Sequence, residues 1–234
     1  MAAGFEGKTV SGFFLNNVKI SFLVNNPKDV IQWCHYHGGF YEQDELKDIS
    51  LVIPTRANIL DIGSNVGNHL VYFIKFCRNV QVTPFEVNPS ALEMLKSNIA
   101  LNAVGNQVND KYLGIALGQF EGHVELINGD KIANNLGAAS FSVSNDPQGL
   151  VMRPLDSLNL EFKPDFMKID VEGMEIAVLL GAEKTILDAR PPLYVEVAPQ
   201  NRAEFKKVLK EWGYTIERTH QRHKGVVNYL CVPW

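Results

Sequence analysis

The chain has 234 residues, 46% of them hydrophobic, with a formal net charge of -4 at pH 7 and a pI near 5.9. This length supports one sizeable core and is short for two full domains. An acidic chain has no general attraction to nucleic-acid phosphates, so we expect no nucleic-acid partner. The basic run from Arg218 to Lys224 is the candidate exception, and its composition is typical of a solvated hairpin loop.

The sequence contains no recognisable targeting or membrane segment. Residues 1–10 lack a basic start followed by an apolar run, and no later segment is long and apolar enough to cross a bilayer. Cys34, Cys77 and Cys231 are widely spaced and form no C-x-x-C pair, which argues against a disulfide framework and a structural zinc site. We therefore expect a cytoplasmic protein with reduced cysteines.

The first 52 residues predict a small cap. Apolar alternation over 10–15 and 18–24 on either side of Asn16-Asn17 predicts a β-hairpin. Asn26-Pro27 would begin a helix that Gly38-Gly39 ends, and residues 41–49 predict a second short helix. We expect residues 1–52 to pack as a cap on a core domain of residues 53–234.

From residue 53 onward, short apolar strands alternate with amphipathic helices, a pattern that predicts an α/β fold with a mostly parallel sheet. Strands are predicted at 59–62, 80–85, 111–116, 166–171 and 193–197, and helices after Asn88, from Met174 to Gly181 and over 202–212. The last strands, 214–218 and 226–232, are separated by a loop too short for a helical crossover and should be antiparallel. Residues 119–158 predict an irregular insert, which more often binds a ligand than separates elements.

The segment ILDIGSNVGNH, residues 59–69, predicts a strand, a glycine loop and the start of a helix. Such a loop presents free backbone N–H groups to an anionic group. The dinucleotide fingerprint needs glycines at offsets zero, two and five, whereas Gly63 and Gly67 stand at offsets zero and four. Asn65 and Asn68 occupy the other two positions, so the loop suits a pyrophosphate poorly.

Two acidic residues end the first two strands of the core. Asp61 lies beside the glycine loop, where a carboxylate repels phosphate and can receive an ammonium group. A ligand that carries both an ammonium and a carboxylate, such as the methionine part of S-adenosylmethionine, fits this pairing. Glu86 lies where an acidic side chain accepts the ribose hydroxyls of either NAD or S-adenosylmethionine.

The fourth strand carries three ionisable residues, Lys168, Asp170 and Glu172, on one side. A central strand is normally buried on both faces, so these groups need partners or a chemical role. They are our candidate catalytic residues, although for Lys168 we favour a structural ion-pair partner over a catalytic group. A hydroxyl acceptor requires a base, and Asp170, Glu172, His69 and His123 are the candidates. Asp170, Glu172 and Glu196 could instead bind a divalent metal, but we expect no resident metal.

Several ordered motifs resemble those of the FkbM-type S-adenosylmethionine-dependent methyltransferases. They are Leu60-Asp61-Ile62-Gly63-Ser64-Asn65-Val66-Gly67-Asn68, Phe85-Glu86-Val87-Asn88-Pro89, Ala116-Leu117-Gly118, Pro154-Leu155-Asp156-Ser157-Leu158 and Lys168-Ile169-Asp170-Val171-Glu172-Gly173-Met174-Glu175, with Gly39-Phe40-Tyr41-Glu42 upstream. The resemblance covers residues 40–218. It implies a class I, Rossmann-like α/β fold with a seven-stranded sheet, mostly parallel with an antiparallel last strand, and helices on both faces.

The resemblance also implies a set of cofactor-binding residues. The methionine part of S-adenosylmethionine would lie against Gly63, Ser64, Asn65, Val66, Gly67 and Asn68, with Asp61 and Asp170 nearby. The ribose would bind Glu86, followed by Val87 and Asn88, and the adenine would lie at Ala116, with Glu42 closing over the cofactor. The implied reaction is O-methylation of a sugar, glycan or other small natural product. A non-catalytic cofactor-binding module and a nicotinamide-dependent oxidoreductase are the alternatives.

Overall fold

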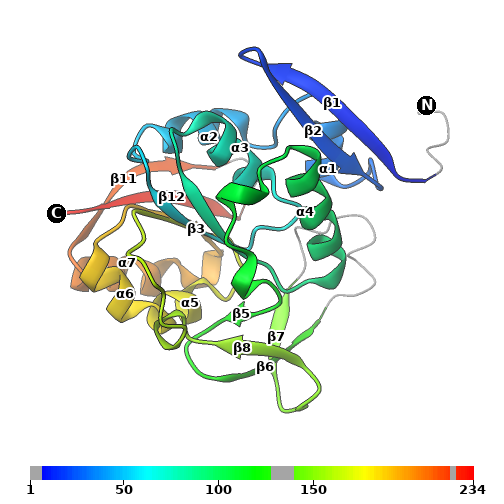
Figure 1. Cartoon of the computed structure of the whole chain (residues 1–234). Helices are drawn as coiled ribbons and strands as arrows, with labels where there is room; N and C mark the ends of the chain where they lie inside the picture. The colour runs from blue at the N-terminus through cyan, green and yellow to red at the C-terminus, as the bar shows by residue number, and fades with distance from the viewer. Residues whose placement is uncertain (1–6, 128–139, 222–224) are drawn as a thin grey trace.

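A computed structural model describes residues 7–127, 140–221 and 225–234 (Figure 1). The elements in chain order are β1 Thr9–Leu15, β2 Val18–Val24, α1 Val30–Tyr36, α2 Gln43–Ser50, β3 Asn58–Ile62, α3 Asn68–Phe76, β4 Gln81–Phe85, α4 Pro89–Leu101, β5 Ala116–Leu117, β6 Gly122–Leu126, β7 Phe141–Ser144, β8 Leu150–Arg153, β9 Phe166–Ile169, α5 Glu175–Gly181, α6 Glu183–Ala189, β10 Leu193–Val197, α7 Arg202–Glu211, β11 Tyr214–His220 and β12 Val227–Pro233.

The central sheet has six strands in the order β11-β12-β10-β9-β3-β4. Strands β4, β3, β9 and β10 run parallel, and β12 is antiparallel to both β10 and β11. The predicted antiparallel end of the sheet is therefore confirmed. Pro84 is tolerated within β4 because this strand lies at the edge of the sheet, where no further neighbour needs its missing N–H.

The strand predicted at 111–116, which would have given the central sheet seven strands, is wrong. Residues Asp110–Tyr112 form a 3-10 turn, which the Asn109 side chain begins by accepting a hydrogen bond from the Lys111 amide. Gly114 then adopts a φ of +88°. On the side of β4 away from β3, the described residues form no further strand of the sheet, and Val82 makes an isolated parallel bridge with Val108. Local Asn and Gly conformations thus override the apolar pattern, and the sheet has six strands rather than seven.

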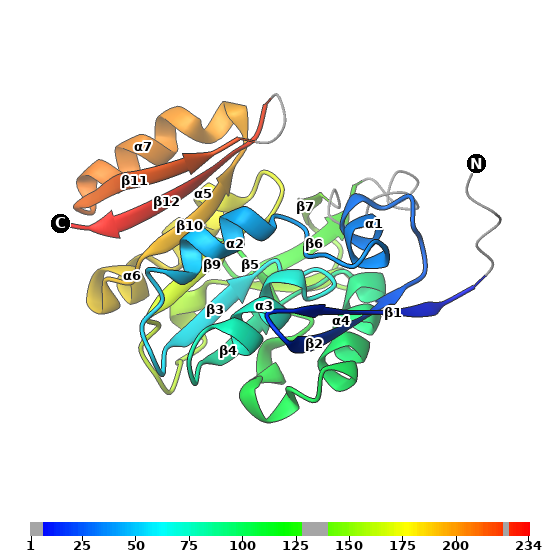
Figure 2. The same ribbon diagram turned by 90° about the horizontal axis from the view of Figure 1, so that it is seen from above.

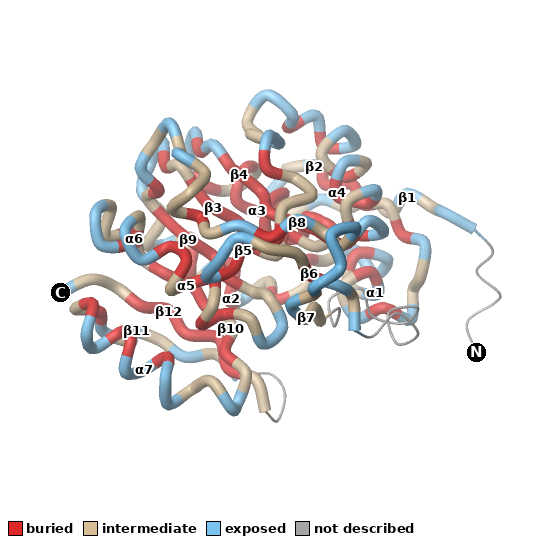
Figure 3. The backbone as a smooth tube through the Cα atoms, turned by 90° about the horizontal axis from the view of Figure 1, so that it is seen from below, coloured by how far each residue is buried: buried red, intermediate tan, exposed pale blue. Residues whose placement is uncertain are grey.

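Helices cover both faces of the sheet (Figure 2). One hydrophobic cluster packs α2, α3, α4 and the hairpin against one face, and a second packs α5, α6 and α7 against the other. Alternate residues of β9 serve the two clusters: Phe166 faces the first, and Met167 and Ile169 face the second. The central strands are accordingly the most buried part of the chain (Figure 3).

The predicted N-terminal hairpin is confirmed, with Asn16 and Asn17 both at positive φ in its turn. The free edge of β2 lies along α4 rather than along another strand. Asn102 Oδ1 accepts a hydrogen bond from the Ser21 amide, and Asn102 Nδ2 donates one to the Ser21 carbonyl. Asn98 Oδ1 accepts a hydrogen bond from the Leu23 amide. The side-chain amides of Asn98 in α4 and of Asn102 at its C-terminal end therefore attach the hairpin to the rest of the fold.

The region 119–158 is more regular than expected. Strands β6, β7 and β8 form a four-stranded sheet with β5, in the order β5-β8-β6-β7. These strands have at most five residues each, too short to give a clear alternation in the sequence. The rest of the predicted insert, residues 128–139, lies outside the described residues.

Other sequence expectations can be compared with the fold. Helix α6 was not predicted; the Asp156 carboxylate begins it by accepting hydrogen bonds from the amides of Lys184 and Thr185. In the basic run, Arg218 forms an ion pair with Asp48, and residues 222–224 lie outside the described residues. The three cysteines are free thiols. Within the described part of the chain, no helix is long and apolar enough to cross a bilayer.

Candidate active site at the carboxyl end of the sheet

The loop between β3 and α3 requires glycine for steric reasons. Gly63 has a φ of +77°, and a Cβ atom there would lie 1.8 Å from the Asp170 carbonyl oxygen. The amides of Gly63 and Ser64 both donate to the Phe85 carbonyl. Gly67, with a φ of +87°, begins α3 and lies against Leu95. The loop is therefore fixed between the ends of β4 and β9, the position where open α/β sheets bind ligands.

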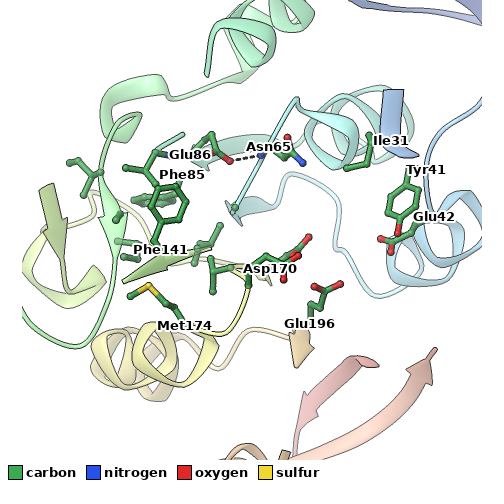
Figure 4. Close-up of a pocket in the computed structure, with 18 of the residues that line it drawn as sticks. Ile31, Tyr41, Glu42, Asn65, Phe85, Glu86, Phe141, Asp170, Met174 and Glu196 are labelled. Carbon is green, nitrogen blue, oxygen red and sulfur yellow. Dashed lines mark hydrogen bonds between the residues drawn. The ribbon is translucent and has the colours of Figure 1, made fainter. Parts of the chain in front are cut away.

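A cleft of about 990 Å³, including the open space at its mouth, lies above this loop. The apolar part of its wall comes from β4, β5, β7 and α1, and its polar part comes from the ends of β9 and β10 and from the residues before α2 (Figure 4). The lining residues are Val30, Ile31, Tyr41, Glu42, Ile62, Gly63, Asn65, Phe85, Glu86, Val87, Ile115, Ala116, Leu117, Phe141, Asp170, Val171, Glu172, Met174 and Glu196. No Lys or Arg occurs among these lining residues.

Glu86 is fixed at the cleft by backbone amides. One carboxylate oxygen accepts from Asn65 N at 2.7 Å, and the other accepts from Val87 N at 2.8 Å and Asn88 N at 2.7 Å. Burial raises the pKa of Glu86, while these three hydrogen bonds oppose the rise. The carboxylate is thus oriented before any ligand arrives, with its remaining acceptor capacity available to a hydroxyl pair.

Lys168 is buried beneath the loop rather than on the cleft wall. Its Nζ donates to the Gly63 carbonyl oxygen at 2.6 Å and lies 3.4 Å from Asp61 Oδ1 and 3.3 Å from Asp170 Oδ2. Burial alone would lower the pKa of Lys168, but the carboxylates of Asp170 and Asp61 outweigh it and raise the pKa. This arrangement favours the structural ion-pair interpretation of Lys168 over the catalytic one.

Asp61 also differs from its expected position. Its side chain is fully buried, its pKa is raised by burial, and it is absent from the cleft lining. The Lys168 ammonium occupies the place expected for the ammonium of a ligand. The physical reason is the register of the sheet: Asp61 pairs with the buried Lys168, one step deeper than Asp170, which lies two residues further along and reaches the open end.

Four carboxylates converge on the polar part of the cleft: Glu42, Asp170, Glu172 and Glu196. Partial burial and the charges of Asp170 and Glu175 raise the pKa of Glu172 to about 7. The charge of Asp170, together with burial and the charges of Glu172 and Glu42, raises the pKa of Glu196. This part of the cleft therefore favours a positively charged ligand and takes up protons readily.

The structure brings only part of the predicted cofactor set to the cleft. Glu42, Gly63, Asn65, Glu86, Val87, Ala116 and Asp170 line it, whereas Ser64, Val66, Gly67, Asn68 and Asn88 do not. Asn68 instead joins the cap to the loop helix: its Oδ1 accepts from the Tyr41 amide and its Nδ2 donates to the Tyr41 carbonyl, each at 3.0 Å. Asn88 begins α4 by accepting from the Ser90 amide.

The two histidine candidates lie away from the cleft wall. His69 Nε2 is 3.5 Å from Glu42 Oε2, behind the lining, and His123 lies on β6 opposite Ser144. Among the described residues, no three His, Cys, Asp or Glu side chains are grouped as metal ligands. The geometry thus gives no support to the metal alternative for Asp170, Glu172 and Glu196.

Some lining residues were not among the predicted site residues. Phe85, Ile115, Leu117, Phe141 and Met174 form the apolar wall, and their sequence pattern is the same as that of core residues. Phe141 comes from β7, within the insert where a ligand-binding element was expected. Its pairing with β6 could not be read from the sequence because both strands are short and no tight turn joins them in the chain.

The comparisons with known proteins point to methyltransferases. The family described as "Methyltransferase FkbM domain" matches residues 61–223. A crystal structure of Methyltransferase FkbM from Methylobacillus flagellatus KT superimposes with a TM-score of 0.54 at 15% identity, covering 85% of this chain and 52% of that one. Precorrin-6y C5,15-methyltransferase from Geobacter metallireducens GS-15 has a TM-score of 0.50 at 12% identity, covering 81% of this chain and 89% of that one.

A further match is the Pyrococcus abyssi tRNA (uracil-54, C5)-methyltransferase in complex with S-adenosyl-L-homocysteine. Its TM-score is 0.52 at 15% identity, with 95% of this chain and 44% of that one covered. The chain therefore spans about half the length of this structure and of the Methylobacillus one. No curated protein matches the sequence. At these identities the structures show the shared fold, and the family match over residues 61–223 shows that the chain belongs to the FkbM methyltransferase family.

Proposed function

We propose that this protein binds S-adenosylmethionine in the cleft and transfers its methyl group to a hydroxyl of a sugar, glycan or other small natural product. The observation that carries the proposal is the Glu86 carboxylate, which three backbone amides hold at the end of β4. A ribose diol would donate its two hydroxyl hydrogens to this carboxylate. Val87 and Ala116 provide the adjoining apolar surface for an adenine ring.

The charge of the cleft supports a sulfonium cofactor over a nicotinamide one. Asp170, Glu172 and Glu196 line the polar part, and the lining includes no Lys or Arg. A pyrophosphate would meet these carboxylates with no cation on the cleft wall to bind it, whereas a sulfonium and an ammonium would be attracted. Asn65 Oδ1, which is buried and has no hydrogen-bond partner among the described residues, is available to the amino-acid end of the cofactor.

The negative charge of the cleft also affects which methyl acceptor can bind. A polyanionic acceptor such as RNA would be repelled by the polar part of the cleft, whereas a neutral hydroxyl compound would not. The carboxylates also provide candidate proton acceptors, which a hydroxyl requires before or during attack on the methyl carbon.

Isothermal calorimetry of the full chain with S-adenosylmethionine, S-adenosylhomocysteine and NAD tests the cofactor. We expect the first two to bind and NAD not to bind at comparable concentration. Transfer of labelled methyl to methyl glycosides of glucose, mannose, galactose and rhamnose, and to a bulk tRNA sample, tests the acceptor, with and without a chelator. NAD binding in place of the sulfonium compounds would overturn the cofactor assignment. Cofactor binding without transfer to any sample would favour the non-catalytic module.

A further inference from the structure

The register of the sheet places polar residues in two rows on the face covered by α2 and α3. In the inner row, Asp61 pairs with Lys168, and Lys168 pairs with Tyr194. Two residues further along β9 and β10, on the same face, stand Asp170 and Glu196, and Glu196 pairs with Asn228 of β12. The inner row is buried, whereas Asp170 and Glu196 reach the open end and line the cleft.

The partners of the four cleft carboxylates distinguish their roles. Asp170 is occupied by the Lys168 ammonium at 3.3 Å. Glu42 accepts a hydrogen bond from Asn228 Nδ2 and lies near His69. Glu172 is the most exposed of the four and lies at the rim, in a left-handed conformation with a φ of 37°. Glu196 is partly enclosed and has no hydrogen bond or ion pair to any described residue.

We infer that Glu196, at the carboxyl end of β10, is the general base of the proposed methyl transfer. Its carboxyl group faces the cleft beside Asp170 (Figure 4). The inference rests on the proposed function and assigns a role to a residue that the sequence indicated only as a metal ligand.

The step balances without a further reagent. The Glu196 carboxylate takes the proton of the acceptor hydroxyl as the acceptor oxygen attacks the methyl carbon of the sulfonium. An O–CH₃ bond forms and the CH₃–S bond breaks, with its electron pair passing to sulfur. The products are the methyl ether, neutral thioether S-adenosylhomocysteine and a protonated Glu196, which returns its proton to water.

The groups around Glu196 explain why it suits this task. Asp170, Glu172 and Glu42 face it with negative charge, and Lys168 provides a compensating cation beneath them. Glu175, on the α5 side, is engaged by the Ala198 amide at 2.7 Å. The surrounding negative charge raises the pKa of Glu196 and makes its carboxylate a stronger base than a free glutamate. A bound sulfonium would oppose this effect and release the proton from Glu196 before the reaction.

Two measurements on Glu196→Gln test the inference. With S-adenosylmethionine and the glycoside that accepts label, we expect kcat to fall by about 100-fold or more, and the decline of the rate at low pH, which reports protonation of the base, to be lost. Calorimetry in buffers of different ionisation enthalpy should show that the wild type releases protons on binding S-adenosylmethionine. Most of this release should be absent in the variant, with cofactor affinity kept within about threefold, less than 1 kcal/mol.

Glu196→Asp should recover part of the rate and its decline at low pH, and Glu204→Gln on the exposed side of α7 should match the wild type. If Glu196→Gln keeps the wild-type rate and pH profile, the inference is overturned while the proposed function stands. A wild type that binds no S-adenosylmethionine, or transfers no methyl group, overturns both. A thermal melt of each variant separates loss of the base from loss of the fold.

Discussion

The two halves of the cleft are built in different ways. On the side of Glu86, where we propose that adenosine binds and which we call the adenosine side, the backbone determines the geometry. Glu86 is held by three main-chain amides, and the loop amides bind the Phe85 carbonyl. On the acidic side, side chains determine it, since Asp170, Glu172 and Glu196 meet at strand ends with Lys168 as the neighbouring cation. The first half is rigid and neutralised by hydrogen bonds, and the second is charged and open to proton exchange.

This difference separates recognition from chemistry. A site preorganised by backbone hydrogen bonds binds its ligand with little reorganisation, and its geometry depends on the fold rather than on pH. A cluster of like charges instead changes its protonation when a cation enters. Substitutions on the two sides should therefore have separable effects, the first on affinity and the second on pH dependence, with Lys168 and Gly63 serving both.

The largest effect is expected for Lys168→Met, because Lys168 compensates both Asp61 and Asp170 from a buried position. Removing one partner of a buried ion pair should lower the free energy of unfolding by about 3–5 kcal/mol. Urea unfolding measures it, with Lys184→Met on exposed α6 as the control. Adding Asp61→Asn should restore part of the loss, and a double variant no more stable than Lys168→Met would contradict the pairing.

Gly63→Ala should be next. A left-handed Ala alone costs about 1–2 kcal/mol, and the new Cβ would also meet the Asp170 carbonyl oxygen. We expect a loss of stability and of S-adenosylmethionine binding together. Gly114→Ala provides the matched control, because Gly114 has a similar φ of +88° with no atom within 4 Å of the added Cβ. Equal destabilisation by the two substitutions would show that the collision with Asp170 is unimportant.

Glu86→Gln tests the adenosine side alone. The amide leaves one oxygen for three backbone donors and the ribose, so the charge-assisted hydrogen bonds are weakened by about 1.5–3 kcal/mol. Calorimetry should show S-adenosylmethionine binding weakened by about 10- to 100-fold. Glu93→Gln, an exposed position on α4, should leave the affinity unchanged. A Glu86→Gln variant with wild-type affinity would remove the main support for the ribose assignment.

The smallest effect is expected at the rim of the acidic side. The pKa of Glu172 is raised from 4.5 to about 7, so between these pH values the folded protein binds more protons than the unfolded chain. Stability should therefore fall as the pH rises from 4.5 to 7. Glu172→Gln should flatten this dependence slightly, as measured by thermal melts across that range, while the other raised carboxyls keep the remaining slope. A steeper slope in the variant would contradict the sign.

The parts of the fold that could be predicted are those with a clear pattern of apolar residues or a clear loop length in the sequence. Strands β3, β9 and β10 are buried on both faces and read as apolar runs, and the final hairpin follows from its short loop. The strand at 111–116 and the small sheet could not be predicted because local Asn and Gly conformations and two- to five-residue pairings decide them. Helix α6 depends on the distant Asp156.

The candidate site shows a similar division. Sequence motifs located Gly63, Glu86 and Asp170 because each ends a strand at the same edge of the sheet. They could not show that Asp61 and Asn68 point away from the cleft, since that depends on Lys168 and on Tyr41 from another element. Likewise, the lack of a hydrogen bond or ion pair between Glu196 and any described residue depends on how the cleft is assembled, and not on the residues next to Glu196 in the sequence.

The two amides of α4 that bind the N-terminal hairpin have a consequence for association between chains. An exposed strand edge is a template on which another chain can add a strand. Asn98 and Asn102 occupy main-chain donors and an acceptor of β2 that such a strand would use, at Ser21 and Leu23. The same two side chains that hold the hairpin in place therefore leave these main-chain groups of β2 unavailable to a strand from another chain.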